Sequence, residues 1–325
     1  MDSYTIELAP PDIEPYRAGN TGIPYYTTFD SGRPGPHVMI NALTHGNELC
    51  GAIAVDRLLR EGVRPLRGRL TLGFANVEAY HRFDAANPTE SRYLDEDLNR
   101  VWSAEVLDGR RRSAELNRAR QIRPLIETVD ILLDIHSMQH KNPPLMLAGP
   151  WSKGRNLARA LAHPEYVVCD AGHAAGRRLR DYGRFDVPKA PQNALLVECG
   201  QHWERRSADV ALESALRVLI HAGMVDQAAA TPHLTDRLPP QKVIEVTQAV
   251  TIESDEFVFA DDFTGMEILP KAGTPIGRDG RREVVAPYDG CVLIMPSRRL
   301  NRGQTAVRLG RLVDGLGAGE FGERP

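Results

Sequence analysis

The sequence predicts an α/β domain, in which helices flank a sheet, followed by a small all-β domain. Up to residue 222, apolar runs of strand length alternate with amphipathic segments of helix length. Polar residues interrupt the apolar runs only near their carboxyl ends. Beyond residue 241 the pattern alternates with a period of two, and Gly and Pro recur at short intervals. A chain of 325 residues is long enough for one large core and a smaller one.

The first predicted strand is the apolar run 37–43, which leads through a turn into a predicted helix at 49–60. The turn carries His45 and Glu48, whose ring nitrogen and carboxylate can converge on one metal ion. The same spacing occurs a second time in the chain, and a histidine bonded to the backbone of a turn is the simpler explanation. Taken alone, the pair does not establish a metal site.

The next predicted strand covers residues 70–75, and a long polar loop follows at 91–102. The loop contains Arg92, Asn99 and Arg100. An arginine beside an asparagine amide suits a substrate carboxylate, and a second arginine nearby can stabilise an oxyanion. A solvated loop with internal ion pairs is the alternative, and it would be preferred for this loop in isolation.

Two further buried strands are predicted at 129–136 and 193–200, each with a polar carboxyl end. Strand alternation places Asp134 and His136 on one face, so Asp134 either orients the histidine or caps the following turn. Glu198 interrupts the second strand, where a lone carboxylate is unfavourable. Beside a metal-activated water it would serve as the general base, because burial raises its pKa; a buried ion pair is the weaker alternative.

The chain resembles the succinylglutamate desuccinylase/aspartoacylase family, relatives of the zinc carboxypeptidases, in four motifs that follow the family's order. The motifs are Thr-His-Gly-Asn-Glu at 44–48, Arg-Tyr-Leu-Asp-x-Asp-Leu-Asn-Arg at 92–100, Asp-Ile-His at 134–136 and Glu-Cys-Gly at 198–200. They span most of the first two-thirds of the chain. The resemblance implies a zinc-carboxypeptidase-like mixed sheet flanked by helices, with one Zn²⁺ per chain.

The same resemblance implies a role for each candidate side chain. The zinc ligands would be His45, Glu48 and His136. Glu198 would be the general base, and Arg92 would stabilise the oxyanion. Asn99 and Arg100 would bind the α-carboxylate of the substrate. The implied reaction is hydrolysis of the amide bond of an N-acyl amino acid, which releases a carboxylate and a free amine.

The identity of the acyl group stays open. In aspartoacylase an arginine upstream of the base binds the acyl-side carboxylate, and Arg184 is the candidate here at a somewhat different spacing. The family's pocket tyrosine has no counterpart in the stretch 295–301. Two other functions are compatible with the same residues: a metallocarboxypeptidase acting on short peptides, and a catalytically silent zinc- or ligand-binding module. The presence of both Glu198 and Arg92 argues against the silent module.

Three segments are predicted along the chain: a catalytic α/β domain at 1–228, a linker at 229–240 and a β-domain at 241–325. The stretch 285–293 resembles a turn of lipoyl- or biotinyl-like domains, but the lysine expected after it is missing. We therefore expect the C-terminal β-domain to cap the active site rather than to carry a cofactor.

Composition gives no electrostatic reason to expect nucleic acid or a membrane as a main partner, and the resemblance implies a small-molecule substrate. The formal net charge of −3, with mixed signs along the chain, favours neither nucleic acid nor a membrane surface. The first residues are polar, and no apolar run approaches the roughly 20 residues of a membrane helix, so we expect a cytoplasmic protein. The four cysteines are scattered in apolar settings, which predicts reduced core thiols. A homo-oligomer is compatible with the sequence, which does not specify an oligomeric state.

Overall fold

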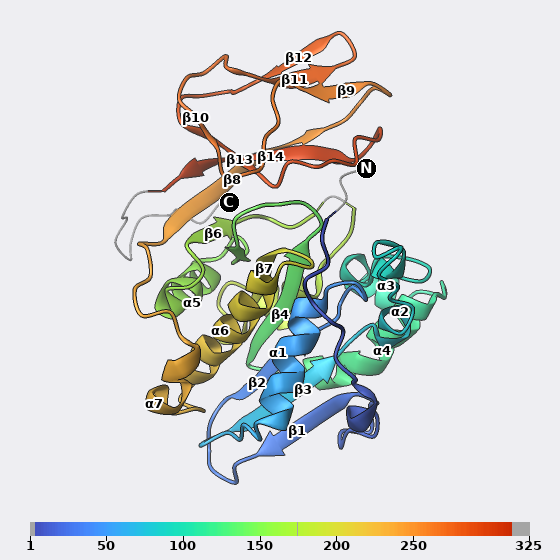
Figure 1. The fold of residues 1–325 in the computed structure, drawn as a ribbon, viewed down its shortest axis with the longest axis vertical. Helices are drawn as coiled ribbons and strands as arrows, with labels where there is room; N and C mark the ends of the chain where they lie inside the picture. Colours follow the sequence, from blue (N-terminus) through green and yellow to red (C-terminus); the bar gives the residue numbers. More distant parts are fainter. Residues whose placement is uncertain (1–3, 174, 314–325) are drawn as a thin grey trace.

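The computed structural model describes residues 4–173 and 175–313, and one mixed sheet of eleven strands forms its centre (Figure 1). Across the sheet the strands are β1 (Tyr26–Asp30), β3 (Arg69–Phe74), β2 (His37–Ala42), β4 (Ile131–Met138), β7 (Asn193–Gln201), β5 (Leu145–Leu147), β6 (Tyr166–Cys169), β8 (Lys242–Thr251), β14 (Thr305–Leu312), β13 (Cys291–Ile294) and β10 (Ile268–Leu269). Strands β3, β2, β4 and β7 run parallel to one another. Their carboxyl ends therefore meet at one edge, where the sequence places its polar residues.

Helices cover both faces of this sheet, as the α/β prediction requires (Figure 1). One face is covered by α1 (Leu49–Arg60), α5 (Ser152–Leu161) and α6 (Arg205–His221), and the other by α3 (Ala104–Leu107) and α4 (Ala114–Ile126). Strand alternation divides the side chains between the two cores: Val38 and Ile40 of β2 enter the first core, and Met39 enters the second.

Short helical segments make up the remaining helical structure of the described residues. They are α2 (Val77–Tyr80), α7 (Gln227–Ala230) and the 3₁₀ turns η1 (Glu14–Tyr16), η2 (Glu90–Arg92), η3 (Leu98–Arg100), η4 (Leu179–Asp181), η5 (Gly183–Asp186) and η6 (Thr231–His233). Several of these turns lie in the long loops that reach the carboxyl edge of the sheet. The hydrogen bonds of these turns define the backbone conformation of the long loops.

The C-terminal part of the described chain is built of strands. Besides β8, β10, β13 and β14, a three-stranded sheet contains β12 (Arg282–Val285), β11 (Pro275–Asp279) and β9 (Phe257–Phe259). These strands enclose a core of their own, and they lie at the top of Figure 1. However, β8 pairs in parallel with β6, so the hydrogen-bonded sheet continues across the predicted linker. The boundary at 229–240 stays a prediction, and helix α7 and turn η6 occupy its beginning.

Two smaller expectations concern the cysteines and membrane helices. Cys50, Cys169, Cys199 and Cys291 are all buried and free of disulfides. Within the described ranges, the helices are too short or too polar to cross a bilayer.

Candidate metal and substrate site

The turn between β2 and α1 brings His45 and Glu48 into contact, with 2.8 Å between His45 Nδ1 and Glu48 Oε1. Gly46, between them, is required by close packing, because an added Cβ would lie 2.4 Å from the carbonyl oxygen of Ser91. The Gly46 N–H donates to the Arg92 carbonyl at 3.0 Å. The turn is thus packed directly against the loop that carries Arg92, and a larger residue at position 46 would push the two apart.

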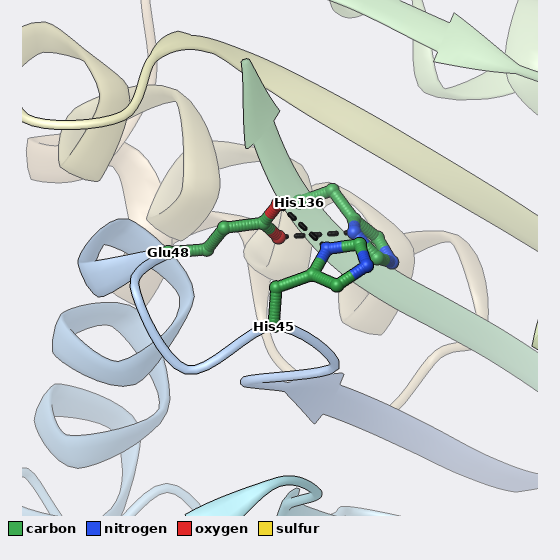
Figure 2. Close-up of side chains that lie close together, drawn as sticks. All are labelled: His45, Glu48 and His136. Atoms are coloured by element: carbon green, nitrogen blue, oxygen red, sulfur yellow. Dashed lines mark hydrogen bonds and ion pairs between the residues drawn. The ribbon is translucent and has the colours of Figure 1, made fainter. Parts of the chain in front are cut away.

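His136, near the end of β4, completes a buried group with the first two residues. Its Nδ1 lies 3.0 Å from Glu48 Oε2, and one ligand atom from each of the three residues lies within 4.8 Å of the others. Figure 2 shows both imidazole rings beside the Glu48 carboxylate. Two imidazoles and one carboxylate are the donor set of many catalytic zinc sites, so these three residues could hold a metal ion.

Each histidine of this group is oriented by an outer carboxylate. His136 Nε2 lies 2.8 Å from Asp134 Oδ2, and His45 Nε2 lies 2.8 Å from Asp97 Oδ1. Both rings therefore present Nδ1 to Glu48, an arrangement that fixes the tautomer of a metal-binding histidine. Asp134 was expected either to orient His136 or to cap a turn. Asp97 belongs to a sequence motif, but nothing in its local pattern indicated this contact.

The charges of the group fit a bound cation. Although burial disfavours its ionised form, Glu48 has a pKa well below its usual range because of His45 and His136. Burial also disfavours a charged His136, but the carboxylates of Asp134 and Glu48 raise its pKa well above the usual value. The group thus holds a proton tightly among several carboxylates. Metal ligands bind in their deprotonated form, so a metal ion would replace that proton.

Glu198 lies beside this group because β4 and β7 are paired in parallel, with His136 directly opposite Glu198. Burial raises the pKa of Glu198 to about 8, while the charges of His136 and Arg92 act in the opposite direction. Its Oε2 is buried without a hydrogen-bond partner, and no ion pair joins it to an arginine in the described residues. A carboxylate in this state is suited to accept a proton from a reacting group.

The polar loop at 91–102 lies against the metal group rather than in solvent. Arg92 Nη2 lies 3.3 Å from Asp97 Oδ2, which places its guanidinium beside the ligands. Asn99 is buried, and its Oδ1 accepts the backbone N–H of Leu179 at 2.9 Å. Arg100 Nη1 donates to the Asn99 carbonyl at 2.8 Å. The structure therefore brings Arg92, Asn99 and Arg100 to the same cavity as the metal group.

That cavity has a volume of about 550 Å³. One part of its lining consists of the candidate residues of the α/β part, namely His45, Glu48, Arg92, Asn99, Arg100, His136 and Glu198. The C-terminal strands and their loops supply another part, including Phe263, Met295, Thr305 and Arg308. Sequence reasoning did not identify Arg178 and Arg308, which also line the cavity. Neither belongs to one of the four motifs, so the sequence held no signal for them.

Arg184, the expected acyl-side arginine, does not reach the cavity. Its side chain is exposed, and its backbone carbonyl accepts Lys153 Nζ at 3.1 Å. The neighbouring Phe185 is buried in the core, which leaves Arg184 on the outer side of turn η5. The expectation for Arg184 is therefore corrected: Arg178 is the arginine of this segment that lines the cavity.

Comparisons with known proteins identify the family and show a similar fold. The family model of the succinylglutamate desuccinylase/aspartoacylase catalytic domain matches residues 34–221. The fold is similar to succinylglutamate desuccinylase from Vibrio cholerae, with a TM-score of 0.67 and 18% identity over 89% of this chain and 86% of that one. An aspartoacylase family protein from Mesorhizobium loti is similar with a TM-score of 0.61 and 18% sequence identity over 90% of each chain. The product-bound ectoine utilization protein EutE from Ruegeria pomeroyi is similar with a TM-score of 0.60 and 21% sequence identity over 88% of each chain. No curated protein matches the sequence.

Proposed function

This chain belongs to the succinylglutamate desuccinylase/aspartoacylase family, and from that premise we propose that it is a zinc-dependent hydrolase of N-acyl amino acids or similar small N-acyl amines. The reaction cleaves the amide bond and releases a carboxylate and a free amine. One observation carries the proposal: a buried His45–Glu48–His136 group lies next to Glu198, which forms no ion pair with an arginine among the described residues.

His45, Glu48 and His136 would hold the zinc ion, because they supply two imidazoles and a carboxylate whose outer partners are already in place. When bound, zinc supplies a Lewis acid that activates a water molecule and polarises the acyl carbonyl. The carboxylates of Asp97 and Asp134 keep the two rings in the orientation that binding needs.

Glu198 accepts the proton of the attacking water, since its raised pKa favours proton transfer near neutral pH. The water oxygen then forms a bond to the acyl carbon, and negative charge develops on the carbonyl oxygen. Arg92, fixed beside Asp97, stabilises that charge. When the carbon–nitrogen bond breaks, Glu198 returns the proton to the amine nitrogen, so the carboxylate ends the cycle in its starting form.

Asn99 and Arg100 bind the α-carboxylate of the substrate. The Asn99 amide nitrogen has no hydrogen-bond partner in the described part of the chain, because only its oxygen is used by Leu179. An arginine fork beside a free amide group fits a carboxylate. Holding this carboxylate would place the amide bond at a constant position relative to Glu198 and Arg92, which accelerates the reaction by proximity.

A metallocarboxypeptidase acting on short peptides could use the same residues, and the size of the cavity separates the two functions. The C-terminal residues Phe263, Met295 and Thr305 line the cavity, whose volume is about 550 Å³. Such a space suits a ligand of drug size or smaller. A small N-acyl amino acid fits within this volume, whereas an extended peptide would have to reach out through the open mouth of the cavity.

The test is hydrolysis of a panel of N-acyl amino acids, with acetyl, formyl, succinyl and aromatic acyl groups, by zinc-loaded protein. We expect turnover of one class, and loss of turnover on removal of zinc by a chelator. The Glu198→Gln variant should lower kcat by about 100- to 10,000-fold while it still binds one zinc ion per chain. Glu253→Gln, on the exposed surface, is the matched control and should retain full activity.

Two results would contradict the proposal. Full activity of the Glu198→Gln variant would exclude Glu198 as the base. Hydrolysis of short peptides, together with no hydrolysis of any N-acyl amino acid, would establish the peptidase instead. A series of substrates with a growing amine side separates these cases, because a deacylase should lose kcat/KM steeply as that side becomes longer.

A further inference from the structure

Glu115, in the first turn of α4, carries a carboxylate that is completely removed from solvent. It forms no ion pair with any residue in 4–173 or 175–313. A buried charge without a partner cation is unfavourable unless hydrogen-bond donors surround it. The donors around Glu115 therefore show which part of the chain this side chain holds in place.

Four N–H groups surround the Glu115 carboxylate. Its Oε1 accepts the backbone N–H of Leu94 at 2.6 Å and the amide N–H of Asn76 at 3.0 Å. Its Oε2 accepts the backbone N–H groups of Asp95 and Glu96 at 3.1 and 3.2 Å. Both oxygens thus act only as acceptors, as those of an ionised carboxylate do. One side chain therefore binds three consecutive backbone N–H groups of the polar loop.

The polar loop also binds back to the start of α4. Asp95 Oδ2 accepts the backbone N–H of Ala114 at 2.7 Å, and Glu96 Oε1 accepts the hydroxyl of Ser113 at 2.5 Å. Ser113 is the N-cap of α4, and its Oγ accepts the backbone N–H of Leu116 at 2.9 Å. This part of the loop is thus fixed to the end of a helix at which negative side chains are favoured.

The segment that Glu115 holds lies between two residues of the site, since Arg92 precedes it and Asp97 follows it. Arg92 Nη2 lies 3.3 Å from Asp97 Oδ2, and Asp97 Oδ1 lies 2.8 Å from His45 Nε2. The Gly46 N–H holds the loop at a second point, because it donates to the Arg92 carbonyl at 3.0 Å. A displacement of about 1 Å in such a site can lower a rate about 100-fold. The backbone between the two residues thus sets the positions on which the reaction depends.

We propose that Glu115 is a positioning residue of the reaction, which acts by holding the backbone of residues 94–96. It thereby fixes Arg92 beside the developing oxyanion and Asp97 beside His45. The inference rests on the proposed function, in which Arg92 stabilises the charge on the carbonyl oxygen. Glu115 is absent from the lining of the cavity, so it acts through these two side chains and does not touch the substrate.

Glu115→Gln tests this role with a small change in shape. The amide has one acceptor oxygen and one NH₂ group, and in either orientation the NH₂ group would face a backbone N–H of the loop. With zinc in excess, we expect kcat to fall by about 10- to 100-fold and KM to stay within about threefold.

Asp279→Asn is the matched control for this variant. Asp279 is also buried, and its carboxylate accepts the backbone N–H groups of Glu253 and Ser254 at 2.8 and 2.9 Å. It lies in β11 and is absent from the lining of the cavity. The control should therefore weaken the fold in a similar way, and its kcat should equal that of wild type.

A double-mutant cycle with Arg92→Gln separates positioning from a loss of folded protein. If Glu115 acts through Arg92, then Glu115→Gln should lower kcat by less than about threefold in the Arg92→Gln background. A substitution that only reduced the fraction of folded enzyme would lower kcat by the same factor in both backgrounds. That result, or an unchanged kcat in the single variant, would overturn the inference even for an active deacylase.

Glu115→Asp replaces the first variant in the same cycle if Glu115→Gln does not fold. It retains the charge, but its side chain is one methylene shorter and cannot keep all four hydrogen bonds. We expect kcat to fall by about 3- to 10-fold, and this loss should disappear in the Arg92→Gln background. Equal losses in the two backgrounds would contradict the inference for this variant as well.

Zinc affinity decides the inference if the wild type hydrolyses no N-acyl amino acid, a result that would reject the proposed function. Because Asp97 orients His45, competition with a zinc-binding dye should show about 3- to 10-fold weaker binding for Glu115→Gln. Asp279→Asn should bind zinc as the wild type does. In that case the positioning role is upheld without the reaction, whereas wild-type affinity in Glu115→Gln would overturn both.

Discussion

The two sides of the cavity differ in how their charges are balanced. We call the first side the metal wall; it comprises His45, Glu48, Asp97, Asp134 and His136. We call the second the arginine wall; it comprises Arg100, Asp170, His173, Arg178, Asp181 and Arg308. Each member of the metal wall contacts another member, whereas Arg100 and Arg308 have no acidic partner in the part of the chain that the structure describes.

This difference assigns a different ligand to each wall. Three carboxylates surround the two histidines of the metal wall, a donor set that suits a cation. The arginine wall has more guanidinium groups than carboxylates free to pair with them, so it lacks an anion. The electrostatic field of the two walls would orient an N-acyl amino acid, with its carboxylate toward the arginine wall. Under the proposed function, the two walls together would orient an acidic substrate in the cavity.

The largest expected effect comes from the balanced part of the arginine wall. Arg178→Met leaves the buried carboxylates of Asp170 and Asp181 without their main partner, and we expect a loss of about 3–5 kcal/mol in the free energy of unfolding. Urea denaturation measures it. Arg184→Met is the control, because its side chain is exposed, and it should change stability by less than about 0.5 kcal/mol. Equal effects at the two positions would contradict the assigned network.

A smaller effect is expected from the outer carboxylates of the metal wall. Asp134→Asn removes the acceptor that orients His136, and it should weaken zinc binding by about 10- to 100-fold. Asp97→Asn should act in the same direction through His45. Competition with a zinc-binding dye measures the affinity, and the exposed Asp84→Asn serves as control. Unchanged zinc affinity in both wall variants would show that the metal binds elsewhere.

Most elements of the α/β part could be predicted, because their periodicity is local. The helix at 49–60 begins and ends where it was expected, and the strand expected at 37–43 is β2. The linker at 229–240 stays a prediction; the Asp226 side chain accepts the N–H of Ala228 and begins helix α7 just before it. The pairing of β8 with β6 could not be predicted, since it joins segments distant in sequence and no local pattern records the register.

The two walls also differed in how well the sequence predicted them. His45, Glu48, His136 and Glu198 follow apolar strands, and parallel strands bring their carboxyl ends to one edge. Arg308, in contrast, occupies an ordinary half-buried position of an alternating strand and carries no local signal. Arg178 and Arg184 lie close together in the chain, and Arg178 is the one that bonds to the buried carboxylates of Asp170 and Asp181. Such long-range contacts exceed what local patterns contain.

The smallest expected effect is a pH dependence that originates in the arginine wall. His173 faces Arg100, Arg178, Arg308 and Asp170, and burial with the net positive charge lowers its pKa to about 3, against about 6.5 in the unfolded chain. Between these values the unfolded state binds more protons, so this residue lowers stability as the pH falls below 6.5. The urea midpoint of wild type should therefore fall more between pH 6.5 and 4 than that of His173→Gln.

Removal of the Arg308 charge tests most directly whether the arginine wall carries excess positive charge. Arg308→Gln takes away one of the three cations that disfavour protonated His173, so the pKa of His173 should rise toward its usual value. NMR titration of ¹³C-labelled histidine measures that pKa. Arg311→Gln should leave it unchanged, because Arg311 is stacked on Tyr288 and is absent from the cavity lining. If His173 titrates near pH 6.5 in the wild type, then the arginine wall does not disfavour a further positive charge, and the assigned difference between the two walls is wrong.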